Sequence, residues 1–459
     1  MMNISLEKVA EAVHGKLCKA SFANKLFISG VSIDTRDNLE EKLFVPLKGT
    51  NVDGHDFLED AYNKGADCVL TEKELDIDKP YILVNSTFQA LKDFARYYRS
   101  LFDIPVIGIT GSVGKTTTKD LTASILSQKY KTLKTEGNFN NEIGLPLTIF
   151  RLDESIEVLV LEMGMNNYGE MHNLSEIAKP NICLITNIGE AHIENLGSRE
   201  GILKAKSEIF DFMDKNGKII LNGDDDMLIT LKSKLDNSHF YYLNKSDADF
   251  TAFDIEHKGI EGVSSKIKIS EDEFTVDIPV AGEHMVYNSI AGAMVGKFLG
   301  LENAEIQKGI AEFKLSKNRM EIININNHII INDVYNSSPK SVKSVIDILC
   351  NHEGRKVCVL GDMFELGDHA DGMHYDVGRY AAEKSIDLII CIGDLSAKMF
   401  DGANENIQSS GNQQVMYFNS VEKFLDESEH LFKEGDAILV KASRGMRFEN
   451  IIKKLREVC

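Results

Sequence analysis

The sequence predicts an α/β protein with three domains, and three observations carry this prediction. Its 459 residues suit about three domains at roughly 150 residues each. From Pro105 onward, short continuous apolar runs alternate with helical stretches, as buried parallel strands and crossover helices do. A glycine-rich loop follows the first of these runs, and the same rhythm starts again near residue 317. We therefore expect domains at 1–103, 104–316 and 317–459.

Composition and charge exclude several classes of protein. Hydrophobic residues make up 43% and charged residues 27% of the chain, which is typical of a folded enzyme. The formal net charge is −20 and no basic stripe occurs, so we expect no nucleic-acid partner. No leader pattern opens the chain and no apolar run approaches the roughly 20 residues that span a bilayer. Seven cysteines without a C-x-x-C pair indicate reduced thiols, so we expect a cytoplasmic protein. We also expect no membrane insertion and a monomer.

The first 103 residues are interpreted as a small α/β unit that closes with a helix over 88–100. Its centre carries two polar, glycine-containing segments, 32–36 and 44–57. Clusters of Asp, Gly, Thr and Asn between apolar runs are usually turns, so these segments alone do not indicate a ligand site.

Nine apolar runs predict parallel strands in the rest of the chain. They lie at 106–109, 158–161, 182–186, 218–221, 329–331, 356–360, 387–392, 415–418 and 437–440. Polar clusters such as 333–336 follow most of the last five, at the sheet edge where parallel α/β folds bind ligands. No G-x-G-x-x-G follows any run, which disfavours a nicotinamide dinucleotide site.

The strongest motif is a phosphate-binding loop between the strand at 106–109 and a helix that reaches about Gln128. Its residues are Thr110, Gly111, Ser112, Val113, Gly114, Lys115, Thr116 and Thr117. Ile109 occupies the usual first glycine position, so this is the T-G-x-x-G-K-T variant. Backbone N–H groups of such a loop bind phosphate oxygens, Lys115 reaches the β- and γ-phosphates, and Thr116 binds Mg²⁺.

A second motif raises an alternative for the nucleotide. Residues 244–247, Asn-Lys-Ser-Asp, match the N-K-x-D pattern that selects guanine in GTPases. No D-x-x-G switch follows a strand, and four loosely specified positions match easily by chance. A GTP-binding switch protein therefore remains the alternative from another functional class.

Glu162 and His192 each end a predicted strand of the central domain. A carboxylate beside a phosphate loop is well placed to hold a metal ion through oxygen, so Glu162 is a candidate metal ligand. A single histidine in a loop, such as His192, says little by itself.

Lys206 lies on the apolar face of a helix predicted over 199–213, with Ser198 as its N-cap. At 100° per residue it falls about 40° from Ile202, whereas Lys204 falls on the opposite face. Two interpretations are open. In the first, the aliphatic stem of Lys206 passes its apolar neighbours and the amine reaches water. In the second, the amine is partly desolvated and able to react or be modified.

Several motifs in the same order resemble the ATP-dependent Mur ligases of peptidoglycan precursor synthesis, over nearly the whole chain. They lie at 44–49 with 53–57, 110–117, 138–146, 162–164, 186–192 with 205–209, 333–339, 361–367 and 441–449. The resemblance implies a small N-terminal α/β domain for the uridine diphosphate end, a central P-loop parallel-sheet ATPase domain, and a C-terminal Rossmann-like domain. It also implies that an acyl phosphate, made with ATP, is captured by an amine to form an amide.

The resemblance further assigns roles to individual residues. Lys115, Glu162, His192 and Lys206 are implied to be catalytic, with Thr116, Glu162 and His192 on Mg²⁺ and Lys206 carbamylated. ATP is implied to contact 111–117 with Asn288, Arg319 and Asp333, and the muramoyl peptide or dipeptide to contact Asn138, Asn141, Tyr335 and Asn336. The uridine nucleotide is implied to contact Ser32, Asp34, Thr35, Arg36, Lys48, Gly49, Asp53 and His55.

Two departures from the family pattern bear on the substrates. Asn318 precedes Arg319 where the family usually has glycine, which weakens the assignment of that arginine. The Asp-Asn-Pro-Arg motif of the diamino-acid-adding ligases is absent, because Ser337-Ser-Pro-Lys340 occupies its region. This favours the branch that joins D-alanyl-D-alanine to UDP-N-acetylmuramoyl-tripeptide. Another ligase of the superfamily, diamino-acid-adding or like folylpolyglutamate synthase, is the nearest alternative.

Overall fold

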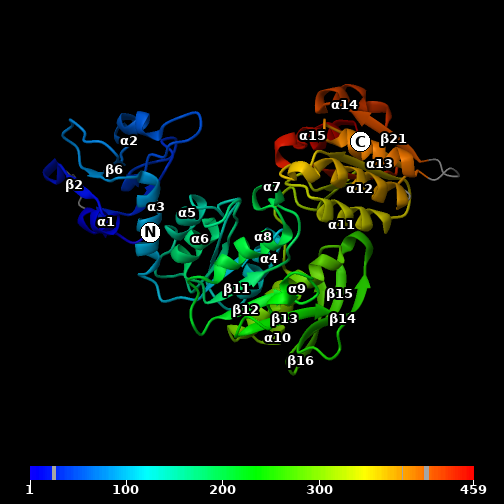
Figure 1. Ribbon diagram of the computed structural model, residues 1–459, viewed down its shortest axis with the longest axis horizontal. Helices are drawn as coiled ribbons and strands as arrows, with labels where there is room; N and C mark the ends of the chain where they lie inside the picture. The colour runs from blue at the N-terminus through cyan, green and yellow to red at the C-terminus, as the bar shows by residue number, and fades with distance from the viewer. Residues whose placement is uncertain (23–26, 385, 408–412, 459) are drawn as a thin grey trace. The chain divides into compact units, whose positions relative to one another are not determined.

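The structure is a computed structural model, and it describes residues 1–22, 27–384, 386–407 and 413–458 (Figure 1). Packing divides the chain into two compact units. The first is Met1–Thr110, Tyr130–Leu184 and Ser207–Lys218, and the second is Gly111–Lys129, Ile185–Lys206 and Ile219–Cys459.

The first unit begins with a five-stranded sheet in the order β2-β7-β6-β5-β4. Its strands are β2 (Lys16–Cys18), β4 (Gly30–Ser32), β5 (Lys42–Phe44), β6 (Cys68–Thr71) and β7 (Tyr81–Leu83). β4 to β7 are parallel and β2 is antiparallel to β7, while β1 (Ile4–Ser5) pairs with β3 (Phe27–Ile28) outside this sheet. The accompanying helices are α1 (Leu6–Ala12), α2 (Leu58–Asn63) and α3 (Thr87–Arg99).

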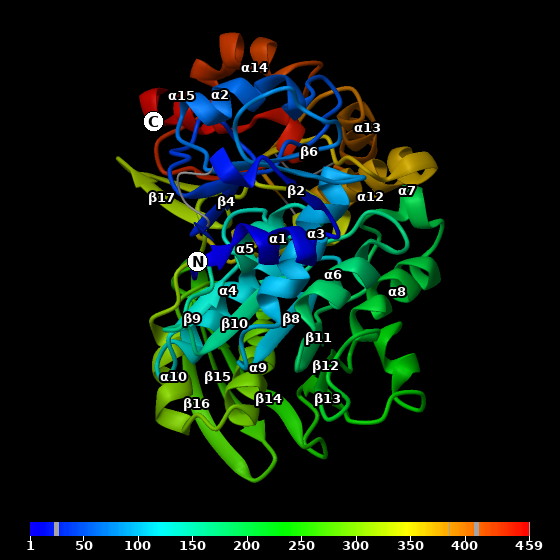
Figure 2. The ribbon, with the colours of Figure 1, turned by 90° about the vertical axis from the view of Figure 1, so that its left-hand side faces the viewer.

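Helix α3 confirms the helix predicted over 88–100 and lies beside two further helices of the first unit (Figure 2). It begins where the Ser86 hydroxyl accepts a hydrogen bond from the Gln89 N–H, a typical N-cap. Its neighbours are α5 (Gly144–Ile149) and α6 (Glu170–Ala178). Lys92 of α3 donates to Glu142, which precedes α5, and Arg96 pairs with Glu176 of α6. These two ion pairs hold α3 against the segment that contains α5 and α6.

Replacing Tyr98 by phenylalanine is expected to destabilise the first unit. The fully buried hydroxyl donates to the Leu152 carbonyl at 2.7 Å and accepts from the Met2 N–H at 2.8 Å. Phenylalanine leaves the carbonyl unpaired, which costs about 1–2 kcal/mol of unfolding free energy. Calorimetry should show a lower unfolding midpoint for this unit. Tyr97→Phe is the matched control, and an equal midpoint for both variants would contradict the prediction.

The first unit also holds four strands in the order β11-β8-β10-β9. They are β8 (Val106–Thr110), β9 (Thr132–Lys134), β10 (Val158–Glu162) and β11 (Ile182–Ile185). β10 is parallel to both β8 and β9, with Glu162 opposite Ile109 in the register. Every residue of β8, β10 and β11 is buried, which explains why these strands appear in the sequence as unbroken apolar runs.

The second unit opens with the phosphate loop and α4 (Lys115–Leu126), followed by α7 (Ile193–Leu196) and α8 (Arg199–Ser207). Five strands then follow in the order β16-β15-β14-β13-β12. They are β12 (Lys218–Asn222), β13 (Ser238–Leu243), β14 (Phe250–His257), β15 (Val263–Ile269) and β16 (Asp272–Ile278). β12 to β14 are parallel, and β14 to β16 are antiparallel. Helices α9 (Glu283–Phe298) and α10 (Asn303–Ala311) complete this part.

A six-stranded sheet in the order β17-β18-β22-β19-β20-β21 follows from residue 321. Its strands are β17 (Glu321–Ile325), β18 (His328–Asn332), β19 (Lys356–Gly361), β20 (Leu388–Ile392), β21 (Gln414–Phe418) and β22 (Ala437–Lys441). All pairs are parallel except β17 with β18. The helices are α11 (Pro339–Cys350), α12 (Ala370–Glu383), α13 (Ser396–Asn406), α14 (Val421–Glu427) and α15 (Glu449–Val458).

This sheet is covered on both faces, as a doubly wound fold requires (Figure 1). Cys358 and Leu360 of β19 pack with residues of α11, α12 and α13. Val357 and Val359 of the same strand pack on the other face, with residues of α14 and α15. The alternation follows from the two-residue period of a strand. The predicted strands from 329 to 440 are therefore confirmed, and the polar segments at their carboxyl ends share one edge of the sheet.

No helix of the described ranges is long and apolar enough to cross a membrane. Six cysteines are free thiols in the described part of the chain, and Cys459 lies outside it. Burial raises the pKa values of Cys68, Cys183 and Cys391 well above that of an ordinary thiol. These thiols are therefore protonated at neutral pH and behave as small core residues.

Candidate active site

The phosphate loop leads from the end of β8 into α4, as the sequence predicts. Gly111 has a φ of 148° and a side chain there would meet the Thr186 hydroxyl at 2.0 Å, so only glycine fits. Gly114 has a φ of 86° and is the N-cap of α4, without a side chain to cap the helix. The first-turn N–H groups of a helix have no partner within the helix. The positive end of α4 is therefore available to a phosphate group.

The segment after β11 holds this loop in place. The Asn187 carbonyl accepts from Ser112 N–H at 3.0 Å, and its side-chain oxygen accepts from Val113 N–H at 3.1 Å. The Thr186 hydroxyl and the Asn187 amide both donate to the Val113 carbonyl, and Gly189 N–H donates to the Ser112 hydroxyl. The Ser112 and Val113 N–H groups are therefore paired with Asn187 in this structure. Asn187 is a site residue that motif reasoning missed.

Lys115 and Thr116 begin α4. The Lys115 ammonium donates to the Gly111 carbonyl at 2.7 Å, so its side chain folds back over the loop. Thr116 is buried at the start of the helix, and Thr117 is half-buried. The Lys115 ammonium thus lies over the phosphate loop.

Asn288 lies next to the phosphate loop from the middle of α9. It is buried, and its side-chain oxygen accepts from the Thr118 hydroxyl of α4 at 3.0 Å. A side chain at Gly114 would lie 3.5 Å from the same oxygen. The structure therefore brings Asn288 to the N-terminal end of α4.

Lys206 is fully buried on α8, and its Nζ has no hydrogen-bond partner among the described residues. The interpretation in which its stem reaches water is therefore wrong. Burial, and then the charge of Lys115, lowers the pKa of Lys206 well below its usual value. Lys204 is exposed, as predicted for the opposite face.

The helix around Lys206 is shorter than predicted. α8 ends at Ser207, and Glu208–Phe210 continues as a single 3-10 turn. Ser198 is confirmed at the start, because its hydroxyl accepts from the Gly201 N–H. The 3-10 turn contacts α6, because the Ser175 hydroxyl of α6 donates to the Ile209 carbonyl.

His192 precedes α7 and has a left-handed φ of 65°. Its Nδ1 lies 2.8 Å from a carboxylate oxygen of Glu365, in the segment that follows β19. The imidazole lowers the pKa of Glu365 below its usual value. Sequence reasoning did not identify Glu365 as a partner of His192, because 173 positions separate them.

Glu162 ends β10 and is buried, with only one carboxylate oxygen hydrogen-bonded. The Asn140 side-chain amide donates to Oε1 at 2.7 Å, while Oε2 is buried without a partner among the described residues. An unpaired buried carboxylate oxygen is costly, so a cation or donor is the expected partner. Asn140 is a further site residue that the predicted set omitted.

The neighbouring asparagines differ from one another. Asn138 is exposed and Asn141 accepts hydrogen bonds from the Ile143 and Gly144 N–H groups at the start of α5. Asn141 therefore has a structural task at a helix terminus.

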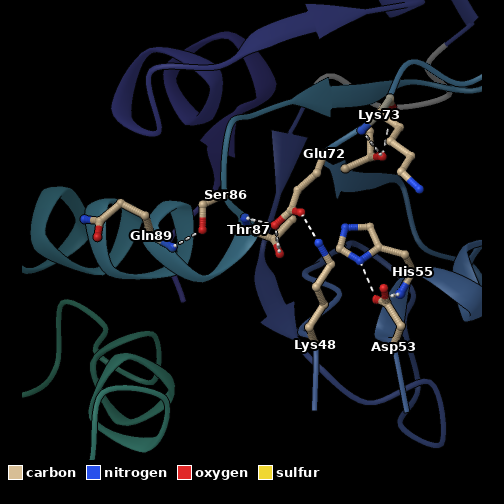
Figure 3. Close-up of polar contacts among 9 residues, drawn as sticks. Lys48, Asp53, His55, Glu72, Lys73, Ser86, Thr87 and Gln89 are labelled. Atoms are coloured by element: carbon tan, nitrogen blue, oxygen red, sulfur yellow. Dashed lines mark hydrogen bonds and ion pairs between the residues drawn. The ribbon is translucent and has the colours of Figure 1, made fainter. Parts of the chain in front are cut away.

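The residues expected around the uridine nucleotide form two separate polar clusters. The first is shown in Figure 3, where the Lys48 ammonium lies 2.5 Å from Glu72 and His55 Nδ1 lies 2.7 Å from Asp53. Glu72 also accepts from Thr87 N–H, which links β6 to the start of α3. The Gly49 N–H donates to Val52 within the same turn.

The second cluster follows β4. The Arg36 guanidinium holds both oxygens of Asp34, at 2.9 and 2.5 Å, and lowers the pKa of that carboxyl to about 2. The Ser32 hydroxyl donates to Asp37, and Thr35 is half-buried between these residues. Arg36 and Lys48, the two cations with such an implied contact, are thus both paired with carboxylates.

The segment after β18 forms a third polar cluster. Asp333 is buried, and its two oxygens accept from the Met320 N–H and from the Lys441 ammonium. Lys441 also donates to the carbonyl of the exposed Asn336. The Arg319 guanidinium lies 3.8 Å from the centre of the Tyr335 ring. Arg319, Asp333, Tyr335 and Asn336 are therefore brought together at the carboxyl edge of this sheet.

The backbone conformation of Asn318 explains why asparagine is tolerated where the family usually has glycine. Its φ is 62°, in the left-handed region where glycine is the least strained residue. Asparagine is one of the side chains that tolerates this region best. Position 318 therefore has a backbone conformation that suits glycine or asparagine.

Residues 244–247 form the turn between β13 and β14. The Asn244 N–H donates to the Ala252 carbonyl, and the Lys245 ammonium lies 4.0 Å from the Tyr242 ring centre. These contacts account for the segment as a turn, and the guanine-selective interpretation gains no support.

No group of three or more His, Cys, Asp or Glu side chains suited to a metal ion occurs in the described ranges. The expected magnesium ligands are of mixed type, the Thr116 hydroxyl, the Glu162 carboxylate and the His192 imidazole. The unpaired Oε2 of Glu162 is the observation that fits a bound cation, since carboxylate oxygen is a preferred ligand of Mg²⁺.

Family models match three consecutive segments. Residues 27–101 match the Mur ligase family catalytic domain, 109–296 the Mur ligase middle domain, and 318–444 the Mur ligase glutamate ligase domain. The UDP-N-acetylmuramoyl-tripeptide–D-alanyl-D-alanine ligase of Bacillus subtilis is 38% identical over 463 residues, covering 100% of this chain and 99% of the relative. The Escherichia coli enzyme of that name is 31% identical, with the same coverage.

Solved structures similar to this chain include members of the same family. A crystal structure of MurF from Acinetobacter baumannii has a TM-score of 0.92 at 29% identity, covering 100% of this chain and 99% of that chain. MurF from Thermotoga maritima in complex with ADP has a TM-score of 0.82 at 29% identity, covering 93% and 97%. A folylpolyglutamate synthase from Mycobacterium tuberculosis, at 16% identity, shares the fold alone.

Proposed function

We propose that this chain, which belongs to the Mur ligase family, joins D-alanyl-D-alanine to UDP-N-acetylmuramoyl-tripeptide with ATP. The observation that carries this proposal is its full-length similarity to relatives with that activity, at up to 38% identity over 463 residues. The Ser337-Ser-Pro-Lys340 segment supports the same branch of the family. The reaction would complete the UDP-muramoyl-pentapeptide precursor of peptidoglycan, in the cytoplasm, by a monomer.

The reaction needs a reactive form of a carboxylate. ATP phosphorylates the tripeptide carboxylate to an acyl phosphate and leaves ADP. The amine of the dipeptide then attacks the carbonyl carbon, the nitrogen loses a proton, and phosphate leaves as the amide forms. Negative charge develops around the transferred phosphoryl group, which Lys115 and the N-terminal end of α4 are positioned to stabilise. Arg319 would supply a second cation.

Mg²⁺ would be held by Thr116, Glu162 and His192, and it would neutralise charge on the phosphate oxygens. Asn140 orients the Glu162 carboxylate through Oε1 and leaves Oε2 for the ion. Asn288 and Asp333 would contact the nucleotide. Lys206 would be carbamylated by CO₂, because its buried amine has no hydrogen-bond partner among the described residues and a lowered pKa.

The uridine nucleotide would bind the first segment, 1–103, at the clusters around Lys48 and Arg36. The muramoyl peptide or dipeptide would contact Asn138, Asn141, Tyr335 and Asn336. The remaining domains would be the ATP-binding segment 104–316 and the Rossmann-like segment 317–459. These assignments follow the family motifs, and each can be tested by substituting the residue concerned.

The decisive experiment supplies the purified protein with the tripeptide precursor, D-alanyl-D-alanine, ATP and Mg²⁺. We expect mass spectrometry to detect UDP-muramoyl-pentapeptide and ADP. Replacing D-alanyl-D-alanine by a diamino acid or a folate with glutamate tests the other ligases of the superfamily. GTP in place of ATP tests the guanine-specific alternative. No pentapeptide, with turnover of another acceptor, would overturn the proposal.

Asn140→Ala is expected to weaken magnesium binding. Without the amide, the Glu162 carboxylate loses its only hydrogen bond among the described residues and can rotate. Loss of a residue that orients a metal ligand typically lowers metal affinity by about 10- to 100-fold. The Mg²⁺ concentration for half-maximal activity should rise accordingly.

Asn167→Ala is the matched control, because it removes an Asn-to-Glu hydrogen bond of 3.0 Å from an exposed turn. Its Mg²⁺ dependence should remain that of the wild type. An unchanged Mg²⁺ dependence for Asn140→Ala would separate Asn140 from the metal site.

A further inference from the structure

Arg319 lies between two residues in the left-handed region. Asn318 has a φ of 62° and Met320 a φ of 46°. Residues other than glycine adopt this region rarely and at a cost, and such residues persist where the surroundings hold them. Two of them on either side of one arginine show that this backbone segment is tightly held.

The segment that follows β18 provides the contacts that hold it. The Tyr335 N–H donates to the Asn318 carbonyl, and the Met320 N–H donates to Asp333 Oδ1, both at 3.1 Å. The Asn332 amide donates to the Asn318 side-chain oxygen at 3.1 Å. Both flanking residues of Arg319 are therefore fixed by residues 332–335.

The Arg319 side chain is held by the face of an aromatic ring. Its guanidinium centre lies 3.8 Å from the centroid of the Tyr335 ring, which is stacking distance. Arg444 lies 5.6 Å from the same centroid, and its charge is paired with Glu449 at 2.6 Å. Arg319 has no carboxylate or carbonyl partner in the part of the chain that the structure describes.

Stacking on a ring leaves the in-plane donors of a guanidinium unused. A guanidinium carries five N–H donors in one plane, and that plane matches the oxygens of a phosphate or carboxylate. A carboxylate partner would occupy these donors, whereas the Tyr335 ring occupies only one face. The side chain is therefore oriented without losing its ability to bind an anion.

We propose that Asn318, Met320 and Tyr335 form a rigid mount that presents the Arg319 guanidinium to a phosphate group, with Tyr335 as a positioning residue. The identity of that phosphate as part of ATP rests on the proposed function, whereas the mount itself rests on the contacts above. Tyr335 acts through Arg319 and needs no contact with the phosphate. Its ring, and not its hydroxyl, performs this task.

A double-mutant cycle tests the mount through the Kd for a non-hydrolysable ATP analogue, measured by calorimetry. Tyr335→Leu removes the ring and should weaken binding about tenfold, while Tyr335→Phe keeps the ring and should change the Kd less than twofold. In an Arg319→Ala background, Tyr335→Leu should have no further effect, because the group that it orients is gone. Losses that simply multiply in the double variant would overturn the proposal.

The backbone half of the mount is tested at Asn318. Asn318→Gly and Asn318→Val both lose the hydrogen bond from Asn332, but glycine keeps the left-handed conformation and should bind more tightly than valine, which is strained there. Equal Kd values for the two variants would contradict the mount. Thermal unfolding midpoints of all variants identify any that fail to fold. If Tyr335→Leu or Asn318→Val does not fold, a loss of binding in a correctly folded Tyr335→Phe, which keeps the ring, would overturn the proposal.

Nucleotide binding and amide formation are measured separately, so the two proposals can fail independently. If the effects of the Tyr335 and Arg319 substitutions on the Kd are not additive but no pentapeptide forms, the mount is supported and the proposed substrates are rejected. If pentapeptide forms but the two substitutions affect the Kd independently, the ligase function is supported and the mount is rejected.

Discussion

Lys115→Ala is expected to lower kcat for ligation by about 10² or more while leaving the fold intact. Its ammonium folds over the phosphate loop, 2.7 Å from the Gly111 carbonyl, and meets the charge that develops on the transferred phosphoryl group. Loss of one preorganised stabilising group costs on the order of 10² to 10³ in kcat. Single-turnover kinetics at saturating ATP measure the effect on the chemical step.

Lys129→Ala provides the control for this substitution. Lys129 is exposed just beyond the far end of the same helix, and its ammonium donates to the Gly300 carbonyl. The control removes the same charge without touching the loop, so kcat should stay within twofold of the wild type. Near wild-type turnover by a correctly folded Lys115→Ala would remove the phosphate loop from the mechanism.

Buried parallel strands were the most predictable part of this fold. The runs at 106–109 and 356–360 contain no polar side chain apart from Lys356, because nearly every residue of their strands is buried. The hairpin of β15 and β16 was not predicted. Its residues alternate between buried and exposed, as in the pattern of β16, so no continuous apolar run marks it.

The candidate site was predictable where one motif holds a complete local geometry. The glycines at 111 and 114 have the positive φ values that a phosphate loop needs, and their spacing is visible in the sequence. Partners from distant segments were not predictable in the same way. Asn187 is 74 residues from Val113, and Asn140 is 22 residues from Glu162. Only packing of the strands shows which polar side chains meet.

Angular position on a helix predicted the burial of Lys206 but not the end of its helix. Periodicity extends to Met213, whereas the structure stops the α-helix at Ser207. A pattern of apolar residues does not distinguish a continuing helix from a 3-10 turn that buries the same side chains. The buried Ile209 fits both geometries, so only the structure could decide.

Lys206→Ala is expected to abolish most activity, and short carboxylic acids are expected to restore part of it. The fully buried amine has no hydrogen-bond partner in the described ranges, and its pKa is lowered by burial and by Lys115. A lowered pKa means that the neutral amine, which reacts with CO₂, is present at lower pH than for a free lysine. The carbamate that forms is an anion, and acetate or formate can take the place of its oxygens.

Lys204→Ala is the matched control, since Lys204 is exposed on the opposite face of α8. It should retain near wild-type kcat and show no response to added acid. Intact-mass measurement of the native enzyme in bicarbonate should show a gain of one CO₂ that Lys206→Ala lacks. If Lys206→Ala folds but acids restore nothing and no mass gain appears, Lys206 has a structural task. Rescue confined to Lys206→Ala instead identifies the amine as the site at which CO₂ is bound covalently.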